Sequence, residues 1–204
     1  MNLRRLLPLL LLTGLAGAVA GLLIAHMLTQ RTIALQGGTA LPKPRALEPF
    51  LLTDTAGRPF ANAMLQGHPT ILYFGFSSCP DACPATLAVL RDLQQRAPLA
   101  GLQVLFVTVD PDHDTSAVLG QYLAAYRHDF IGLRAAPGTL APLLRNLSAF
   151  AGRQDLPGGQ YRVDHSSTLY LLDTRGRLAA VFTPPFTAAA LAADLRSLAR
   201  SDVL

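Results

Sequence analysis

Two uninterrupted apolar segments constrain the fold of this chain more than any other feature of its sequence. Residues 70–76 read TILYFGF and residues 104–109 read VLFVTV, and neither segment contains a charged side chain. Such runs are typical of strands that are buried on both faces of a sheet. Between them, residues 84–97 place apolar side chains at steps of three or four, which indicates a helix with one buried face. We therefore predict an α/β domain.

The same patterns predict further elements on either side of this core. Apolar residues at helical spacing predict helices in three more segments, at about 115–127, 138–150 and 187–200. Strands are predicted around two turns that contain Asp, Thr and Gly, at 49–52, 58–60, 168–172 and 178–182. Together these elements predict a mixed α/β sheet with helices on both faces, in one domain over residues 47–204.

The N-terminal segment is apolar enough to enter a membrane. Residues 6–30 contain no Asp, Glu, Lys or Arg, and about 20 apolar residues are enough for a helix to cross the hydrocarbon core of a bilayer. Residues 18–20 (AVA) have the small side chains of a signal-peptide cleavage site, so a cleaved signal peptide is the alternative. Because the apolar run continues through residues 22–24, we favour a single transmembrane anchor over residues 6–28.

The charges beside this anchor predict its orientation. Arg4 and Arg5 precede the apolar run, and the positive-inside rule then keeps residues 1–5 in the cytoplasm. The domain is expected on the periplasmic side of the inner (cytoplasmic) membrane. Residues 29–46 contain two adjacent Gly and two Pro without apolar periodicity, so we predict that they form a tether between anchor and domain.

Net charge and cysteine content exclude several classes of protein. The chain has a net charge of +4, and removing residues 1–28 leaves 15 basic against 13 acidic residues, a net of +2. A nucleic-acid partner is not expected, because such proteins concentrate basic residues on one face. Two cysteines are too few for a disulfide-rich framework or for a four-cysteine zinc site within one chain.

The two cysteines, Cys79 and Cys83, are four residues apart and follow directly on the first apolar run. In a helical turn this spacing places both sulfur atoms on one face, where they can form a disulfide or bind one metal ion. Pro80 and Pro84 favour a helix that begins at Pro84, with a looser turn before it. A purely structural disulfide is the alternative, but closing so short a loop stabilises little through chain entropy.

A soft metal ion held by two thiolates usually takes a further ligand, and imidazole is the common choice. His165 lies just before the strand predicted at 168–172 and is the candidate of interest. By composition alone, however, a single loop histidine is more often not a ligand. The other histidines lie in the apolar N-terminal run or in polar turns and helix ends, and they are His26, His68, His113 and His128.

Three short motifs resemble, in the same order, the motifs of the Sco/SenC family. They are FSSCPDACP at residues 76–84, VDPDHDT at 109–115 and VDHS at 163–166. The resemblance extends over roughly residues 47–200, behind an N-terminal anchor. Two positions depart from the common pattern: Ser78 stands where many members have His, and His113 stands where Arg is common.

This resemblance implies a thioredoxin-like fold and a copper site. It implies that copper, as Cu(I), Cu(II) or both, is held by Cys79, Cys83 and His165. It further implies delivery of copper to the binuclear copper centre of cytochrome c oxidase subunit II, reduction of the cysteines of that centre, or both. The expected partner is therefore subunit II or another copper-accepting protein, with no small-molecule substrate.

Several acidic residues lie near these motifs. Asp110, Asp112 and Asp114 have the alternate spacing of a calcium loop, but the Gly and the final Glu of that pattern are missing. We instead predict that Asp114 is the N-cap of the following helix. Asp81 and Asp164 are the acids nearest the cysteines and His165 in sequence, and each is either solvated or tunes the site.

Two functions compete for the cysteine pair. A metallochaperone would hold copper on Cys79, Cys83 and His165 and pass it to a partner. A thiol–disulfide reductase would use Cys79 to attack a disulfide and Cys83 to resolve the mixed disulfide, and such an enzyme would need no histidine. A peroxidase of similar fold leaves the His165 motif unexplained. His165 therefore favours the metallochaperone.

Overall fold

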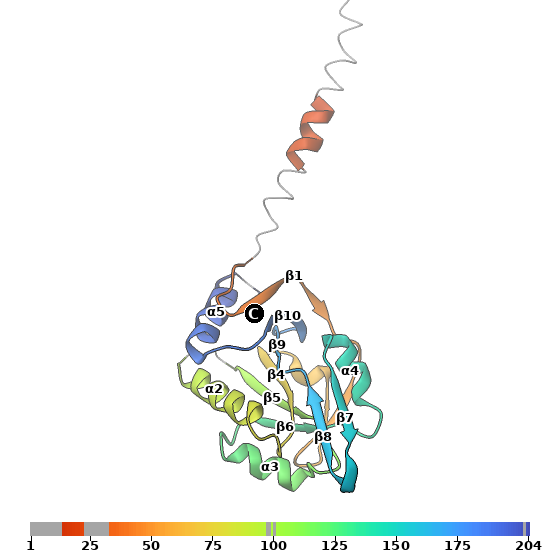
Figure 1. The fold of residues 1–204 in the computed structure, drawn as a ribbon. Helices are drawn as coiled ribbons and strands as arrows, with labels where there is room; N and C mark the ends of the chain where they lie inside the picture. Colours follow the sequence, from red (N-terminus) through yellow and green to blue (C-terminus); the bar gives the residue numbers. More distant parts are fainter. Residues whose placement is uncertain (1–13, 23–32, 97–98, 100, 202) are drawn as a thin grey trace, which may run out of the picture. The chain divides into compact units, whose positions relative to one another are not determined.

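A large mixed sheet forms the centre of the domain (Figure 1). The structure is a computed structural model, and it describes residues 14–22, 33–96, 99, 101–201 and 203–204. Within these residues, eight strands follow the order β1-β10-β9-β4-β5-β6-β2-β3. The neighbours β4, β5 and β6 are parallel, and the remaining pairs are antiparallel. The strands of this sheet are β1 (Gly38–Ala46), β2 (Leu51–Asp54), β3 (Pro59–Ala61), β4 (Thr70–Gly75), β5 (Gln103–Thr108), β6 (Ile131–Arg134), β9 (Leu169–Leu172) and β10 (Arg177–Phe182).

Helices flank this sheet, and a hairpin forms a separate small sheet. The α-helices are α2 (Ala82–Arg96), α3 (Ser116–Ala124), α4 (Leu140–Leu147) and α5 (Ala188–Arg200). Short 3-10 helices occur at η1 (Asn62–Leu65) and η2 (Pro157–Gly159). The hairpin consists of β7 (Ala151–Asp155) and β8 (Tyr161–His165), which pair with each other in a two-stranded sheet.

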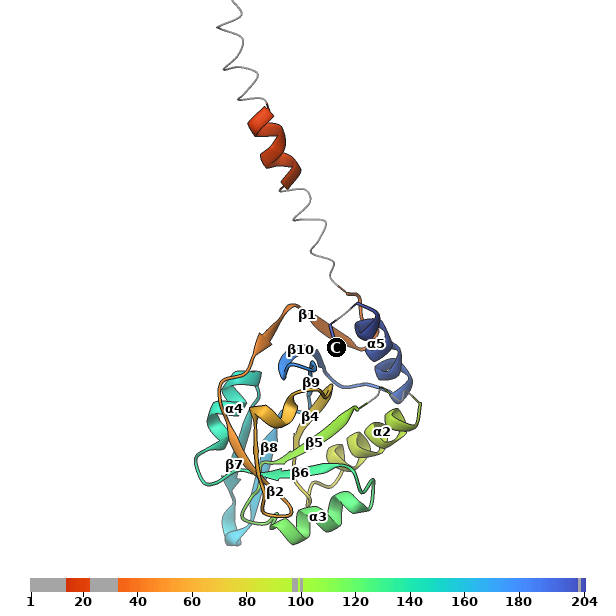
Figure 2. The ribbon, with the colours of Figure 1, turned by 180° about the vertical axis from the view of Figure 1, so that it is seen from behind.

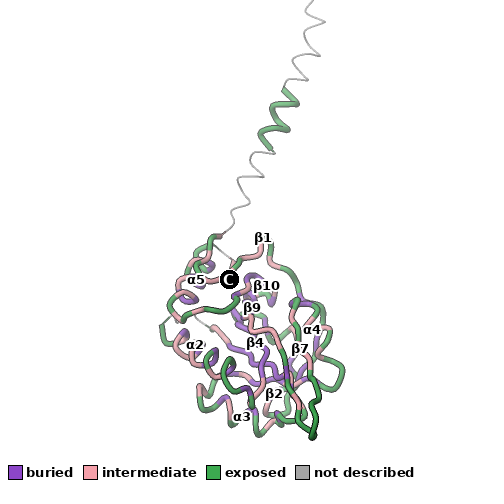
Figure 3. The backbone as a smooth tube through the Cα atoms, in the orientation of Figure 1, coloured by how far each residue is buried: buried purple, intermediate pink, exposed green. Residues whose placement is uncertain are grey.

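The two faces of the large sheet bury two apolar clusters. On β4, Ile71 and Tyr73 face a cluster that α2, α3 and α5 cover, whereas Leu72 and Phe74 face a cluster that α4 and η1 cover. Because successive side chains of a strand point to opposite faces, a central strand needs an unbroken apolar run to fill both clusters. Figure 2 shows the helices from behind, and Figure 3 shows that burial is greatest along the central strands. The predicted mixed α/β sheet with helices on both faces is confirmed.

The tether predicted over residues 29–46 is wrong for residues 38–46, which form β1. This strand pairs with β10 in an antiparallel register, so that Thr39 lies opposite Val181. The preceding residues are also tied to the domain, because the backbone N–H groups of Gln36 and Gly37 donate to the carboxylate of Asp194 at 2.7 and 2.9 Å. Backbone hydrogen bonds to β10 therefore hold a segment that has no apolar periodicity of its own.

The anchor predicted over residues 6–28 falls largely outside the described residues. Residues 14–22 of that segment are described, and they are helical. Among all the described residues, none belongs to a helix that has both the length and the apolar character needed to cross a membrane.

Candidate metal centre

The cysteine loop joins β4 to α2 at the end of the central strand. After Gly75 the chain leaves the sheet, and the N–H of Cys79 donates to the carbonyl of Phe76 at 3.3 Å. The helix begins at Ala82, two residues before the predicted start at Pro84. This start costs no hydrogen bond, because the first backbone N–H groups of a helix have no intrahelical acceptor and Pro84 falls in that first turn.

Both cysteines are buried, Cys83 completely and Cys79 with a small exposed part. The exposed fraction is 0% for Cys83 and 9% for Cys79, and both are free thiols. The N–H of Cys83 donates to Sγ of Cys79 at 3.4 Å, and the hydroxyl of Tyr73 donates to Sγ of Cys83 at 3.6 Å. A Cβ atom on Gly75 would lie 2.9 Å from Sγ of Cys83, so glycine is needed for the sulfur to pack against β4.

His165 is the last residue of β8, rather than a residue of the loop in which the sequence placed it. Its Nδ1 lies 3.0 Å from the carbonyl oxygen of Ser166. A carbonyl accepts only, so Nδ1 carries the proton and donates, which leaves the lone pair of Nε2 free. Nε2 lies 3.6 Å from Sγ of Cys83. The hairpin therefore presents a ligand-competent imidazole to the buried thiol.

The structure brings together all three residues that the sequence analysis selected. One potential ligand atom from each of Cys79, Cys83 and His165 lies within 4.8 Å of the other two. Among the described residues, these three form the one group of His, Cys, Asp or Glu side chains close enough together to hold a metal ion. A cavity of about 670 Å³ opens beside them, and Phe76, Cys79 and His165 contribute to its wall. An ion held by the three side chains would therefore be accessible from one side.

Burial controls the protonation of these groups. It raises the pKa of the Cys83 thiol to about 12, although backbone hydrogen bonding at Phe76 and the hydroxyl of Tyr73 act in the opposite direction. Burial likewise lowers the pKa of His165, against the opposing effects of the Ser166 carbonyl and the Asp164 carboxylate. The apo site at neutral pH thus holds a protonated Cys83 and a neutral imidazole, and a bound cation would displace the thiol proton.

Two aromatic rings that the sequence analysis did not single out enclose the imidazole. The ring centroids of Tyr73 and Phe76 lie 6.0 and 5.7 Å from that of His165, both in edge-to-face orientation. Burial also raises the pKa of Tyr73, which therefore remains a hydrogen-bond donor to Cys83. Both residues belong to the first apolar run, where nothing in the sequence separates a site residue from a core residue.

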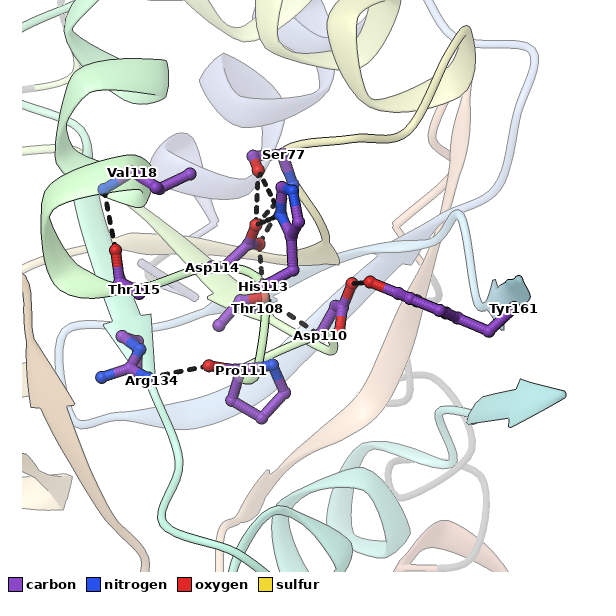
Figure 4. Close-up of polar contacts among 10 residues, drawn as sticks. All are labelled: Ser77, Thr108, Asp110, Pro111, His113, Asp114, Thr115, Val118, Arg134 and Tyr161. Atoms are coloured by element: carbon purple, nitrogen blue, oxygen red, sulfur yellow. Dashed lines mark hydrogen bonds and ion pairs between the residues drawn. The ribbon is translucent and has the colours of Figure 1, made fainter. Parts of the chain in front are cut away.

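The predicted N-cap role of Asp114 is wrong. Thr115 caps α3, because its hydroxyl accepts from the N–H of Val118. Asp114 is instead buried, and its carboxylate accepts from the backbone N–H and the hydroxyl of Ser77 and from the hydroxyl of Thr108 (Figure 4). The sequence could not show this, because Ser77 lies 37 residues away in the cysteine loop.

The remaining candidates are peripheral to the site. His68 contacts the carbonyl of Gly101 at 3.3 Å, and His128 is exposed. Asp81 is exposed, and Asp164 is paired with Arg162 at the surface. Of these two acids, only Asp164 acts on the site, because its charge raises the pKa of His165 slightly against the larger effect of burial. His26 lies outside the described residues.

The fold and the site define a thioredoxin-like α/β domain with two thiols and an imidazole at the end of its central strand. Residues 38–200 match the SCO1/SenC family, and the chain belongs to that family. The expected thioredoxin-like α/β fold is thereby confirmed.

Individual relatives show how far the similarity extends. A putative copper-binding protein of Stutzerimonas stutzeri is 39% identical over 145 residues, which are 68% of this chain and 69% of that protein. The match spans 65% of the SCO2-like protein RP587 of Rickettsia prowazekii, at 35% identity, and 44% of SCO2 of Saccharomyces cerevisiae, at 37% identity. The chain thus spans less than two thirds of several relatives.

The similar solved structures include relatives with copper bound. ScoI of Bradyrhizobium japonicum is 31% identical, with a TM-score of 0.67 over 74% of this chain and 98% of that one. Yeast Sco1 is 30% identical, with a TM-score of 0.69 over 78% of this chain and 90% of that one. The metal expected from the sequence motifs is therefore the metal that these homologous structures contain.

Proposed function

We propose that this protein is a copper metallochaperone in which Cys79, Cys83 and His165 hold the copper ion. The observation that carries the proposal is the convergence of two free thiols and one unprotonated imidazole nitrogen within 4.8 Å. Two thiolates and an imidazole suit copper, because soft thiolates favour Cu(I) and imidazole also suits Cu(II). The copper-bound structures of related Sco proteins support this choice of metal.

The geometry of the site suits transfer rather than permanent storage. Cys83 is fully buried, and Cys79 lies at the wall of the cavity beside Phe76. An acceptor's ligand can enter from this cavity and bind copper while Cys83 and His165 still hold it. Copper is then transferred while both proteins coordinate it, and no step releases a free ion.

The recipient that we propose is the binuclear copper centre of cytochrome c oxidase subunit II. Membership of the SCO1/SenC family supports a role in assembling that oxidase. We further propose that residues 6–28 anchor the chain in the inner membrane, with residues 1–5 in the cytoplasm and the domain in the periplasm. Tethering would raise the effective concentration of the domain near a membrane-bound acceptor. Because β1 belongs to the domain, the linker after the anchor is shorter than predicted.

The second candidate is a membrane-anchored thiol–disulfide reductase. The short distance between the two thiols supports it. Cys79 would attack a target disulfide and form a mixed disulfide, which releases the first target thiol. Cys83, whose N–H already contacts Sγ of Cys79, would then attack Cys79 and release the second target thiol. The two electrons gained by the target leave this protein oxidised as a Cys79–Cys83 disulfide.

One set of gene replacements separates these functions. Deletion of the gene should lower cytochrome oxidase activity when copper is scarce, and added copper should partly restore it. His165→Ala should fail to restore activity if copper transfer is the function, whereas a reductase would tolerate the change. Cys79→Ser should fail in both cases, and His68→Ala, which alters a surface histidine, is the matched control.

Two results would contradict the proposal. Normal oxidase activity in the deletion strain at limiting copper would exclude subunit II as the recipient that depends on this protein. A reporter fused after Leu204 that is active only in the cytoplasm would exclude the proposed topology.

A further inference from the structure

The hairpin that carries His165 is not a member of the large sheet. Within the described residues, its strands β7 and β8 form backbone strand pairs only with each other, and an isolated two-stranded hairpin has little stability of its own in water. Contacts with the rest of the domain therefore hold the hairpin in place. The ring of His165 itself packs against Tyr73 and Phe76, and other side chains of the hairpin make further contacts.

The loop between β5 and α3, residues 109–114, makes these contacts (Figure 4). The hydroxyl of Tyr161 donates to Oδ2 of Asp110 at 2.6 Å, and Asp110 is only 3% exposed. Tyr161 is four residues before His165 on β8, so the two side chains point to the same face of the strand. Fixing the Tyr161 hydroxyl therefore restrains the orientation of His165.

A second contact reinforces the first. The guanidinium of Arg153 on β7 lies 3.8 Å from the ring centroid of Tyr161, and it also reaches the carboxylate of Asp112 at 3.5 Å. Both strands of the hairpin thus contact the same loop. The Arg153–Asp112 ion pair is exposed and contributes little, so the Tyr161–Asp110 hydrogen bond supplies most of the restraint.

The other end of this loop holds the cysteines. The carboxylate of Asp114 accepts hydrogen bonds from the N–H of Ser77 at 3.0 Å and from the Ser77 hydroxyl. Ser77 lies two residues before Cys79 in the cysteine loop. The loop itself is rigidly held, because the N–H of Asp114 donates to the carbonyl of Asp110 at 2.9 Å and Arg134 donates to the carbonyl of Pro111 at 2.8 Å.

We propose that residues 109–114 form a clamp that sets the distance between the cysteine loop and His165, with Asp110 and Tyr161 as positioning residues for the imidazole. The clamp deepens the proposed copper function and rests on it. It links two elements that lie 82–88 positions apart in sequence, in addition to the direct contacts of His165 with Cys83, Tyr73 and Phe76. Because imidazole contributes more to Cu(II) than to Cu(I) on a dithiolate site, the clamp selectively supports Cu(II) binding.

Tyr161→Phe tests this proposal on the full chain in detergent, because it removes one hydroxyl and keeps the ring that Arg153 contacts. Loss of a hydrogen-bonding partner of a metal ligand typically lowers metal affinity by roughly 10- to 100-fold. The range that applies here is a loss of up to about tenfold, because the Tyr161 hydroxyl bonds to Asp110 and not to His165 itself. We expect a loss in this range for Cu(II), a weakened nitrogen hyperfine signal in the electron paramagnetic resonance spectrum, and a much smaller change for Cu(I). Asp110→Asn should behave in the same way, and Tyr126→Phe is the matched tyrosine control.

A combined variant distinguishes positioning from general destabilisation. In a His165→Ala background, Tyr161→Phe should have no further effect on copper affinity, because the residue that it positions is gone. The clamp is refuted if Tyr161→Phe binds Cu(II) as the wild type does, or if it weakens Cu(I) and Cu(II) equally with and without His165. A wild-type protein that binds no copper would instead refute the proposed function itself.

Discussion

Raising the pH on the apo protein should reveal that Cys83 is far less acidic than an ordinary cysteine. Burial raises the pKa of its thiol from 9.0 to about 12, despite partial compensation by backbone hydrogen bonding at Phe76 and by the Tyr73 hydroxyl. At neutral pH this difference corresponds to a thiolate population roughly a thousandfold smaller, or about 4 kcal/mol. Copper must supply that free energy when it displaces the proton.

The assay is the ultraviolet absorbance of thiolate, recorded on the full chain as a difference between the wild type and Cys83→Ser. This difference isolates Cys83 from Cys79 and from the tyrosines. We expect almost no difference signal at about pH 9, where half of an unperturbed thiol would be ionised, and a midpoint well above that value. A midpoint close to pH 9 would refute the burial argument.

The sign of the accompanying stability change follows from linkage. The folded-state pKa of Cys83 lies above its unfolded value, so its contribution to the free energy of unfolding is fully present below about pH 9 and is lost as the pH rises toward about 12. Cu(I) binding releases the same proton, so Cys83 alone should make the apparent Cu(I) affinity rise about tenfold per pH unit from neutral pH upward, and any proton released from Cys79 adds to this slope.

Three further outcomes are expected. Cys79→Ser or Cys83→Ser should abolish tight copper binding measured by competition with a chelator, whereas His165→Ala should weaken Cu(II) binding more than Cu(I) binding; equal retention in all three variants would contradict the ligand assignment. Oxidation to a Cys79–Cys83 disulfide should prevent loading, and stoichiometric copper on protein without free thiols would contradict this. Burial raises the pKa of Asp54, but hydrogen bonds and charge from Arg58 outweigh it and keep that pKa below its ordinary value. The Asp54 carboxylate therefore stabilises the fold above about pH 4, and this contribution is lost in more acidic solution. Asp54→Asn should lower the free energy of unfolding by about 1 kcal/mol in urea denaturation at neutral pH and leave the copper spectrum unchanged.

The central strands and the last helix could be predicted because burial alone determines their pattern. Thr70–Gly75 must fill two apolar clusters, and its sequence is apolar throughout. Strand β1 lacked such a signal, because Pro42 and Pro44 interrupt it and its register with β10 shifts between Ala40 and Arg45. Its place in the sheet depends on backbone pairing with a strand far along the chain.

The candidate ligands could be selected from motifs, but the groups that we propose to position them could not. Strand β7 is largely polar and exposed, and β8 has a single buried residue, Val163, so the hairpin has no apolar pattern strong enough to predict it. Asp114 stands where an N-cap would stand, and only tertiary structure shows that its partners are Ser77 and Thr108. Likewise, nothing in the sequence relates Asp110 to Tyr161, which lies 51 residues further on.

X-ray absorption spectroscopy of the Cu(I)-loaded full chain tests the central claim most directly, because it identifies the atoms bound to copper. We predict two sulfur ligands and one imidazole nitrogen in the wild type, no tightly bound copper in Cys79→Ser or Cys83→Ser, and loss of the nitrogen with both sulfurs retained in His165→Ala. A copper ion without sulfur ligands, or a spectrum that His165→Ala leaves unchanged, would contradict the assignment of Cys79, Cys83 and His165 as the copper site.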